Sequence, residues 1–218
     1  MKPVAVFRSP LPEKFGIPRQ AGVVPELKGE IQLTGEFARP EALRGLEGFD
    51  YLWLIWEFSL NGDGDGSLTV RPPRLGGNER VGVFASRSPF RPNRLGLSSA
   101  RIEGIDFENC IIRVSGADLA DSTPIFDIKP YVEYTDSHPG ARSGFVDSND
   151  WQPLEVTLPS GAEEILGADD TAALRSLLSQ DPRPAYQDDP HRIYGLAFSG
   201  HQIHFCVCGR TLTVKSIN

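Results

Sequence analysis

The hydrophobic pattern of the first two thirds of the chain is typical of short β-strands. Seven segments are rich in Val, Ile, Phe or Trp and are bounded by Gly, Pro, Asn or Asp. They are residues 3–7, 31–37, 51–59, 80–86, 96–105, 110–116 and 124–132. Their spacing predicts a β-barrel, with one helical turn at 42–48. Within residues 51–59, the run YLWLIWEF (51–58) is apolar almost throughout, which predicts a central strand buried on both faces.

The last third of the chain has a different pattern. Residues 133–150 are dense in Ser, Asp, Gly and Pro and predict a loop. After it we expect a strand at 154–158, a helix at 162–180, and an antiparallel meander at 193–198, 202–207 and 211–215. The predicted fold is mainly β, with an N-terminal β-barrel domain (1–135), a linker (136–152) and a small α+β C-terminal domain (153–218).

Composition places the chain among ordinary globular proteins, with 218 residues of which 39% are hydrophobic and 23% charged. The apolar run near the N-terminus is too short for the core of a signal peptide, and no later segment resembles a membrane span. The cysteine number, three, is odd, which argues against a disulfide framework. We therefore expect a cytoplasmic protein with reduced cysteines and no membrane partner.

Charge is unevenly distributed along the chain. The net charge of −7 argues against a nucleic-acid partner. Residues 71–101, however, contain seven arginines and one acidic residue, a local net charge of +6. This segment is either an ordinary solvated surface or an anion-binding site, and its arrangement favours the anion site.

Two apparent metal motifs do not meet the requirements of a metal site. NGDGDG (61–66) imitates the start of a calcium loop, but Pro72 stands where the loop requires a bidentate Glu. In HQIHFCVC (201–208), His204, Cys206 and Cys208 share one face of a strand, where three adjacent ligands are poorly spaced for zinc, so a buried core face is favoured. No metal is expected. Rossmann, P-loop, zincin and hydrolase motifs do not occur.

The segment RSPFRPNRLGLSS (87–99) is difficult to explain by folding alone. Pro89 and Pro92 fix an extended path that cannot pair fully in a sheet. Gly96 permits a ligand to approach the backbone closely. The guanidinium groups of this segment suit phosphate or carboxylate, and they belong to Arg87, Arg91 and Arg94.

Five motifs make the chain resemble the TsaA/TrmO family of S-adenosylmethionine-dependent tRNA methyltransferases, in the family's order. They are PRQ (18–20), VRPPRLGG (70–77), VGVFASRSPFRPNRLGLS (81–98), LADSTPIFDIKPY (119–131) and DPRPAY (181–186). The resemblance implies a β-barrel catalytic domain, a small C-terminal domain, and a homodimer with the cofactor near the subunit interface. It also implies methylation of the N6 nitrogen of threonylcarbamoyladenosine beside the anticodon of tRNA.

The resemblance also implies roles for individual residues. Expected cofactor contacts are Pro18, Arg19, Gln20, Ser59, Leu60, Arg87, Leu97, Asp121, Ser122, Thr123 and Pro124. Expected tRNA contacts are Arg71, Arg74, Arg91 and Arg94, extended by Arg183 and Tyr186. The sequence departs from the family at Ser122, where DGTP has Gly, and at Ser59 and Leu60, where some members have His followed by a polar residue.

Methyl transfer from a sulfonium requires positioning and exclusion of water rather than a metal. The aromatic rings of Trp53, Trp56, Phe58 and Tyr131 are compatible with a sulfonium cation, but packing in the core is the favoured explanation for them. Asp127 and Tyr131 are candidates to assist loss of the acceptor's proton. The alternatives are an Asp127 ion pair with Lys129 and a packed tyrosine.

Two other functions are compatible with the same residues. The first is a non-catalytic RNA- or nucleotide-binding barrel, in which the arginines bind phosphates without methyl transfer. The second is an S-adenosylmethionine-dependent methyltransferase acting on a small metabolite.

Overall fold

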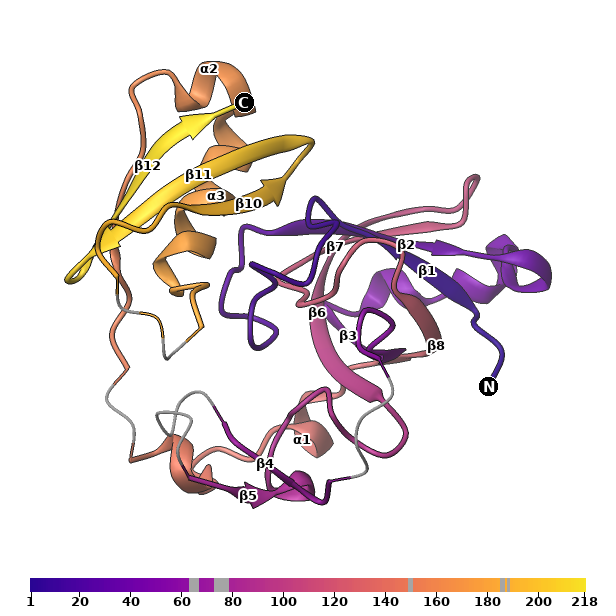
Figure 1. Cartoon of the computed structure of the whole chain (residues 1–218). Helices are drawn as coiled ribbons and strands as arrows, with labels where there is room; N and C mark the ends of the chain where they lie inside the picture. Colours follow the sequence, from indigo (N-terminus) through magenta and orange to yellow (C-terminus); the bar gives the residue numbers. More distant parts are fainter. Residues whose placement is uncertain (63–66, 73–78, 149–150, 185–186, 188) are drawn as a thin grey trace.

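The computed structural model describes residues 1–62, 67–72, 79–148, 151–184, 187 and 189–218 (Figure 1). Six strands close into an antiparallel barrel in the order β1-β2-β7-β6-β3-β8. They are β1 (Ala5–Arg8), β2 (Lys28–Leu33), β3 (Tyr51–Glu57), β6 (Leu95–Asp106), β7 (Ile111–Ser115) and β8 (Pro124–Pro130). The predicted mainly β fold with an N-terminal barrel is confirmed.

Strand β3 pairs with β6 on one side and β8 on the other. Burial alternates along it, with Leu52, Leu54 and Trp56 inside and Tyr51 exposed. The prediction that this strand is central and buried on both faces is therefore wrong. In a closed barrel every strand has two neighbours, and only the inward side chains enter the core.

The predicted barrel strand at 80–86 is also wrong. Residues Val81–Gly82 (β5) pair only with Thr69–Val70 (β4), and a 3-10 turn follows at Val83–Ala85. This hairpin lies apart from the barrel (Figure 1). It is held by Arg80, whose Nε donates to Oγ1 of Thr69 at 2.7 Å. The predicted helical turn at 42–48 is present as two 3-10 turns, Pro40–Leu43 and Leu46–Gly48.

The C-terminal unit is the predicted α+β structure. Its sheet has the order β10-β11-β12-β9, in which β9 is parallel to β12. The strands are β9 (Glu155–Thr157), β10 (Tyr194–Phe198), β11 (His201–Cys208) and β12 (Thr211–Ile217). The single predicted helix is two helices, α2 (Ala162–Leu166) and α3 (Ala168–Ser179), because Gly167 between them has a φ of 81°. A short helix, α1 (Glu133–Asp136), occupies the start of the predicted loop.

The buried face of β11 is formed by Ile203, Phe205 and Val207, not by the face that carries His204, Cys206 and Cys208. The expectation of a core face for these three residues is wrong, because the opposite, apolar face of β11 packs against helix α3. Among the described residues no group of three or more His, Cys, Asp or Glu side chains is placed to hold a metal ion.

The two units share a core through the segment that follows β1. Leu11, Val24 and Leu27 pack in the same hydrophobic cluster as Leu174 of α3 and Phe205 of β11. The barrel has its own cluster. The segment between β1 and β2 therefore joins the barrel to the C-terminal unit and fixes the position of residues 18–20. No helix in the described part of the chain is long and apolar enough to span a membrane.

Candidate cofactor and tRNA site

Local hydrogen bonds shape the arginine segment between the 3-10 turn and β6. The backbone N–H of Ser88 donates to Oγ of Ser86, and that of Phe90 donates to Oγ of Ser88. Serine hydroxyls here accept the backbone hydrogen bonds that a neighbouring strand would accept in a sheet. Nη1 of Arg91 donates to the carbonyl oxygen of Ser86 at 3.0 Å and closes the loop.

Arg87 connects this loop with the PRQ segment. Its Nη1 donates to Oε1 of Gln20 at 2.5 Å, and its side chain is exposed. Two of the predicted cofactor segments, 67 positions apart, therefore meet. Neighbouring Pro18 is buried, which fixes the backbone beside Gln20.

Arg94 turns back onto the barrel. Its Nη2 lies 2.9 Å from Oε1 of Glu57, and its φ is 51°. A left-handed backbone at a non-glycine residue is unfavourable. Here it is held by hydrogen bonds of the Arg94 backbone to Arg91 and Phe58. Arg71 is exposed. Arg74, a further expected phosphate contact, lies outside the described residues.

Gly96 does not open space for a ligand, contrary to the prediction. An added Cβ atom at this position would overlap the indole ring of Trp56. Trp56 is 5% exposed and packs at 4.3 Å from Phe58 between ring centroids. These two aromatic side chains therefore belong to the core, and Gly96 is required by the close approach of Trp56.

A hydrogen-bonded chain runs from this tryptophan to a buried carboxyl group. Nε1 of Trp56 donates to Oγ of Ser98 at 2.9 Å, and Oγ of Ser98 donates to Oδ1 of Asp118 at 2.5 Å. Burial raises the pKa of Asp118, while Ser98, the charge of Arg87 and the backbone N–H of Ala21 act to lower that pKa. Sequence reasoning missed Asp118. A signal existed, because this acid lies between two small or apolar residues directly before a family motif.

The Asp121–Pro124 turn extends the edge of the barrel at β1. The side chain of Asp121 accepts from the N–H of Ser9 at 3.1 Å, and the N–H of Ser122 donates to the carbonyl oxygen of Phe7 at 2.8 Å. Thr123 is buried, and Pro124 begins β8. These contacts hold the turn at the end of β1, where the chain continues toward Gln20.

Leu97 and Asp127 lie on the same outward face of the barrel. Ile55 of β3 is opposite Leu97 on β6 and opposite Asp127 on β8, so the three residues form a row. With strands spaced about 4.8 Å apart, Asp127 is about 10 Å from Leu97. Asp127 lies 3.5 Å from Nζ of Lys129, and its carboxylate also accepts from the N–H of Ile128.

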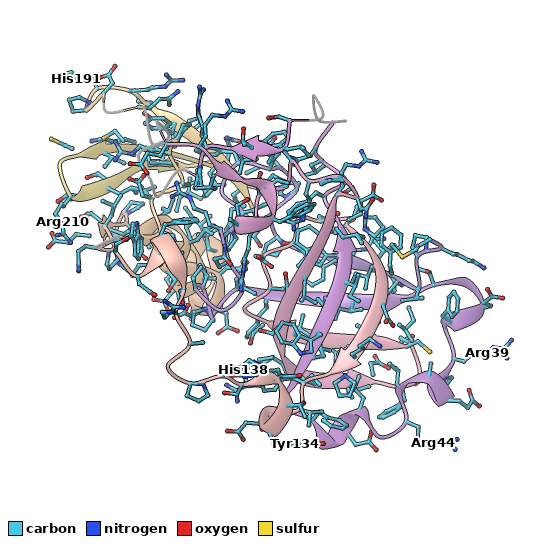
Figure 2. The ribbon with its side chains drawn as sticks, turned by 90° about the horizontal axis from the view of Figure 1, so that it is seen from below. Arg39, Arg44, Tyr134, His138, His191 and Arg210 are labelled. Carbon is cyan, nitrogen blue, oxygen red and sulfur yellow. The ribbon has the colours of Figure 1, made fainter. Side chains whose placement is uncertain are left out.

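Tyr131 lies at the opposite end of β3 from the arginine segment. It packs against Tyr51 and Trp53, with ring centroids 6.2 and 5.8 Å away. Arg94 binds Glu57 at the other end of the strand, about 20 Å away by the rise of a strand. Helix α1 follows Tyr131, and Figure 2 shows its Tyr134 on the side of the molecule away from His191 and Arg210. The structure therefore does not bring Tyr131 and Arg87 together.

The last predicted contacts lie where α3 ends. Nη2 of Arg19 donates to the carbonyl oxygens of Asp181 and Arg183. The Arg183 side chain is 9% exposed and binds Asp181 through both Nε and Nη2 at 2.9 Å. Arg183 is thus largely buried in its ion pair with Asp181, and its expected role as a phosphate contact stays a prediction. Tyr186 lies outside the described residues.

Comparison with known proteins identifies the family. The model of the tRNA-methyltransferase O N-terminal domain matches residues 6–137, and that of the TrmO C-terminal domain matches residues 152–218. The chain belongs to the TrmO family. The resemblance stated from its motifs is confirmed.

Named relatives of this TrmO-family chain come from several organisms. It is 40% identical to a tRNA (adenine(37)-N6)-methyltransferase of Escherichia coli K12 over 84% of this chain and 82% of that protein. It is 39% identical to a putative S-adenosylmethionine-dependent methyltransferase, RcsF, of Pseudomonas aeruginosa, over 94% and 91%. The crystal structure of TrmO from Pseudomonas aeruginosa superposes with a TM-score of 0.79 at 30% identity, covering 99% of this chain and 97% of that one.

The departures from the TrmO family motifs have a structural setting. Ser122 has a φ of 61°, a left-handed conformation that glycine adopts more readily. Its hydroxyl offsets part of this strain, since it donates to Oδ2 of Asp121 and accepts from Nη1 of Arg8. Ser59 and Leu60 follow β3 at the surface, where Leu60 is 47% exposed.

Proposed function

We propose that this protein is an S-adenosylmethionine-dependent tRNA methyltransferase that methylates the N6 nitrogen of adenosine 37, in the form of threonylcarbamoyladenosine. The observation that carries the proposal is the contact between Arg87 and Gln20. It joins two motifs of the TrmO family at the end of the barrel where the remaining proposed cofactor segments also lie. The names of the relatives support the same reaction.

The residues at this end of the barrel fit the chemistry of the cofactor. S-adenosylmethionine combines a carboxylate, a sulfonium and an adenine ring. Arg87 offers an exposed fork suited to the carboxylate, Gln20 offers an amide, and Leu97, 60% exposed, offers an apolar surface. The complete proposed cofactor set is Pro18, Arg19, Gln20, Ser59, Leu60, Arg87, Leu97, Asp121, Ser122, Thr123 and Pro124.

The cofactor supplies a methyl group on a sulfonium when it is bound, so the protein's task is to orient the acceptor nitrogen and to exclude water. The nitrogen must lose a proton as it gains the methyl group. Asp127 is the candidate acceptor that we favour, because it lies on the outward face with Leu97. The position of Tyr131 at the other end of β3 makes it the weaker candidate.

We place tRNA phosphates at the arginine segment and the hairpin beside it. Arg71 is exposed, and Arg91 uses one nitrogen for its loop contact while a guanidinium has five N–H donors. Arg74, Arg94 and Tyr186 complete the proposed tRNA set. Arg183 holds the 181–183 turn that Arg19 binds and acts indirectly.

We also propose a cytoplasmic homodimer whose second copy packs on apolar side chains beside the arginine segment. Large apolar side chains are exposed around it, including Phe84 at 78%, Phe90 at 52% and Leu97 at 60%. Exposed apolar clusters of this kind mark interaction surfaces. A subunit interface here would place the cofactor beside the partner, as the family resemblance implies. The cytoplasm is where a tRNA substrate is available.

Transfer of a labelled methyl group tests the proposal against both alternatives. Purified protein with labelled S-adenosylmethionine should label tRNA that carries threonylcarbamoyladenosine and should not label tRNA from cells that lack this nucleoside. A binding module would transfer no label to either tRNA. Equal labelling of both tRNAs would exclude the proposed acceptor. Labelling only of small metabolites would favour a methyltransferase that acts on a small metabolite.

A further inference from the structure

Asp118 connects the barrel wall with two of the proposed cofactor segments. Oγ of Ser98, on β6, donates to the Asp118 carboxylate at 2.5 Å, and Trp56, on β3, donates to Ser98. On the other side, the backbone N–H of Ala21 and the charge of Arg87 act on the same carboxyl group. Ala21 directly follows the PRQ segment.

A second contact holds the PRQ segment along the same stretch of chain. The N–H of Gly22 donates to the carbonyl oxygen of Gly116 at 2.8 Å. Residues 20–22 therefore run beside residues 116–118, and Gln20 projects from this stretch to meet Arg87. The stretch that carries Asp118 therefore lies next to the stretch that carries Gln20, and the proposed cofactor contacts do not include the Asp118 carboxylate.

We propose that Asp118 is a positioning residue of the cofactor site, which fixes the PRQ segment and Arg87 against the barrel wall through Ser98. The inference rests on the proposed function, since it assumes that Arg87 and Gln20 bind S-adenosylmethionine. A carboxylate suits this role because each oxygen accepts hydrogen bonds, so it can bind the Ser98 hydroxyl and the Ala21 N–H together. Its negative charge also attracts the Arg87 guanidinium.

The substitution Asp118→Asn separates this role from simple filling of space. Asparagine has nearly the same volume, but its NH2 group is a donor and cannot accept from either Ser98 or Ala21. The substitution therefore breaks one of the two anchors and removes the charge that faces Arg87. The matched control is Glu103→Gln, because Glu103 accepts from the Ser115 hydroxyl at 2.6 Å elsewhere on the barrel.

The dissociation constant of S-adenosylmethionine, measured by calorimetry on the full chain, tests the inference. We expect about a tenfold weaker affinity in Asp118→Asn, a smaller loss in Ser98→Ala, and an unchanged affinity in Glu103→Gln. At saturating cofactor, kcat should stay close to that of the unsubstituted protein, since the loss is one of binding. The Ser98→Ala variant keeps the test available if Asp118→Asn does not fold.

Acidification supplies a readout that a purely structural role would not produce. Burial raises the pKa of Asp118, so lowering the pH toward that pKa converts one carboxylate oxygen into a donor, as asparagine does. Cofactor affinity of the unsubstituted protein should fall over this range, while that of Asp118→Asn stays flat. Arg87, whose charge acts on Asp118, remains protonated throughout.

The outcomes distinguish the inference from the function on which it rests. Equal affinity in Asp118→Asn and the unsubstituted protein would overturn the inference, as would an equal loss in Glu103→Gln. Failure of the unsubstituted protein to bind S-adenosylmethionine would instead overturn the proposed function.

Discussion

Arg87 and Gln20 are separated by 67 positions in the chain, yet Nη1 of Arg87 lies 2.5 Å from Oε1 of Gln20. Neither residue is in a strand. Arg87 belongs to the segment that leads into β6 of the barrel. Gln20 belongs to the segment that the shared core holds through Leu11, Val24 and Leu27. The contact therefore depends on both structural units.

Replacing Arg87 by Ala should weaken cofactor binding without unfolding the protein. The side chain is exposed, so stability should change by less than about 0.5 kcal/mol. Loss of charged hydrogen bonds should weaken S-adenosylmethionine binding about 10- to 100-fold. Calorimetry measures the affinity and thermal unfolding measures the fold. Unchanged methylation kinetics in this variant would remove Arg87 from the site.

Replacing Gly96 by Ala should destabilise the barrel, because the new methyl group would overlap the Trp56 ring. Overpacking of this kind costs about 1 to 3 kcal/mol. Gly104→Ala on the same strand is the control, since a Cβ there meets no atom within 4 Å. Urea unfolding of both variants compares them. Equal stability would show that Trp56 moves aside without cost.

Two carboxyl groups should give the free energy of unfolding opposite dependences on pH. The pKa of Asp118 is raised by burial, so the folded protein binds its proton more tightly than the unfolded chain, and this contribution to stability is lost as the pH rises through the raised pKa. The pKa of Asp136 is lowered, first by the N–H of Val132 and then by the indole of Trp53. Its contribution is present above the unfolded pKa and is lost as the pH falls.

Urea unfolding across a pH series, with Asp118→Asn and Asp136→Asn, measures these contributions. Each variant should lose the pH dependence of its own residue and keep that of the other. If Asp118→Asn keeps the whole of the unsubstituted profile, the carboxyl group is not perturbed in the folded protein.

Replacing Arg183 by Ala should affect stability more than RNA binding. The substitution leaves the partly buried Asp181 carboxylate without its two-point partner, which should cost about 1 to 3 kcal/mol after allowing for solvent at Asp181. Arg71→Ala should show the opposite pattern, with unchanged stability and weaker, less salt-dependent tRNA binding. Equal stability of the two variants would contradict the internal role of Arg183.

Much of the fold follows from patterns within the sequence. Strands β1, β3, β6, β7 and β8 are marked by β-branched and aromatic residues between turn residues, and all five were predicted close to their observed bounds. The break at Gly167 was missed, because helical spacing continues across it. The domain boundaries at 135 and 153 stay predictions, since Leu11, Val24 and Leu27 pack with the C-terminal unit.

The site was less predictable because its contacts are made between distant segments. A segment such as 80–86 has a strand's composition, but no barrel neighbour pairs with it. The burial of Arg183 depends on Asp181 in a turn, and the position of Asp118 depends on Ser98 in another strand. Hydrophobic periodicity and composition describe one segment at a time, so they could not reveal the Arg183–Asp181 and Asp118–Ser98 contacts.

Mass spectrometry of tRNA nucleosides tests the central claim most directly. Cells that lack the gene for this protein should contain threonylcarbamoyladenosine without its N6-methylated form, and expression of the protein should restore the methylated nucleoside. Expression of Arg87→Ala should not restore it. Methylated threonylcarbamoyladenosine at the same level with and without the gene would contradict the proposed function.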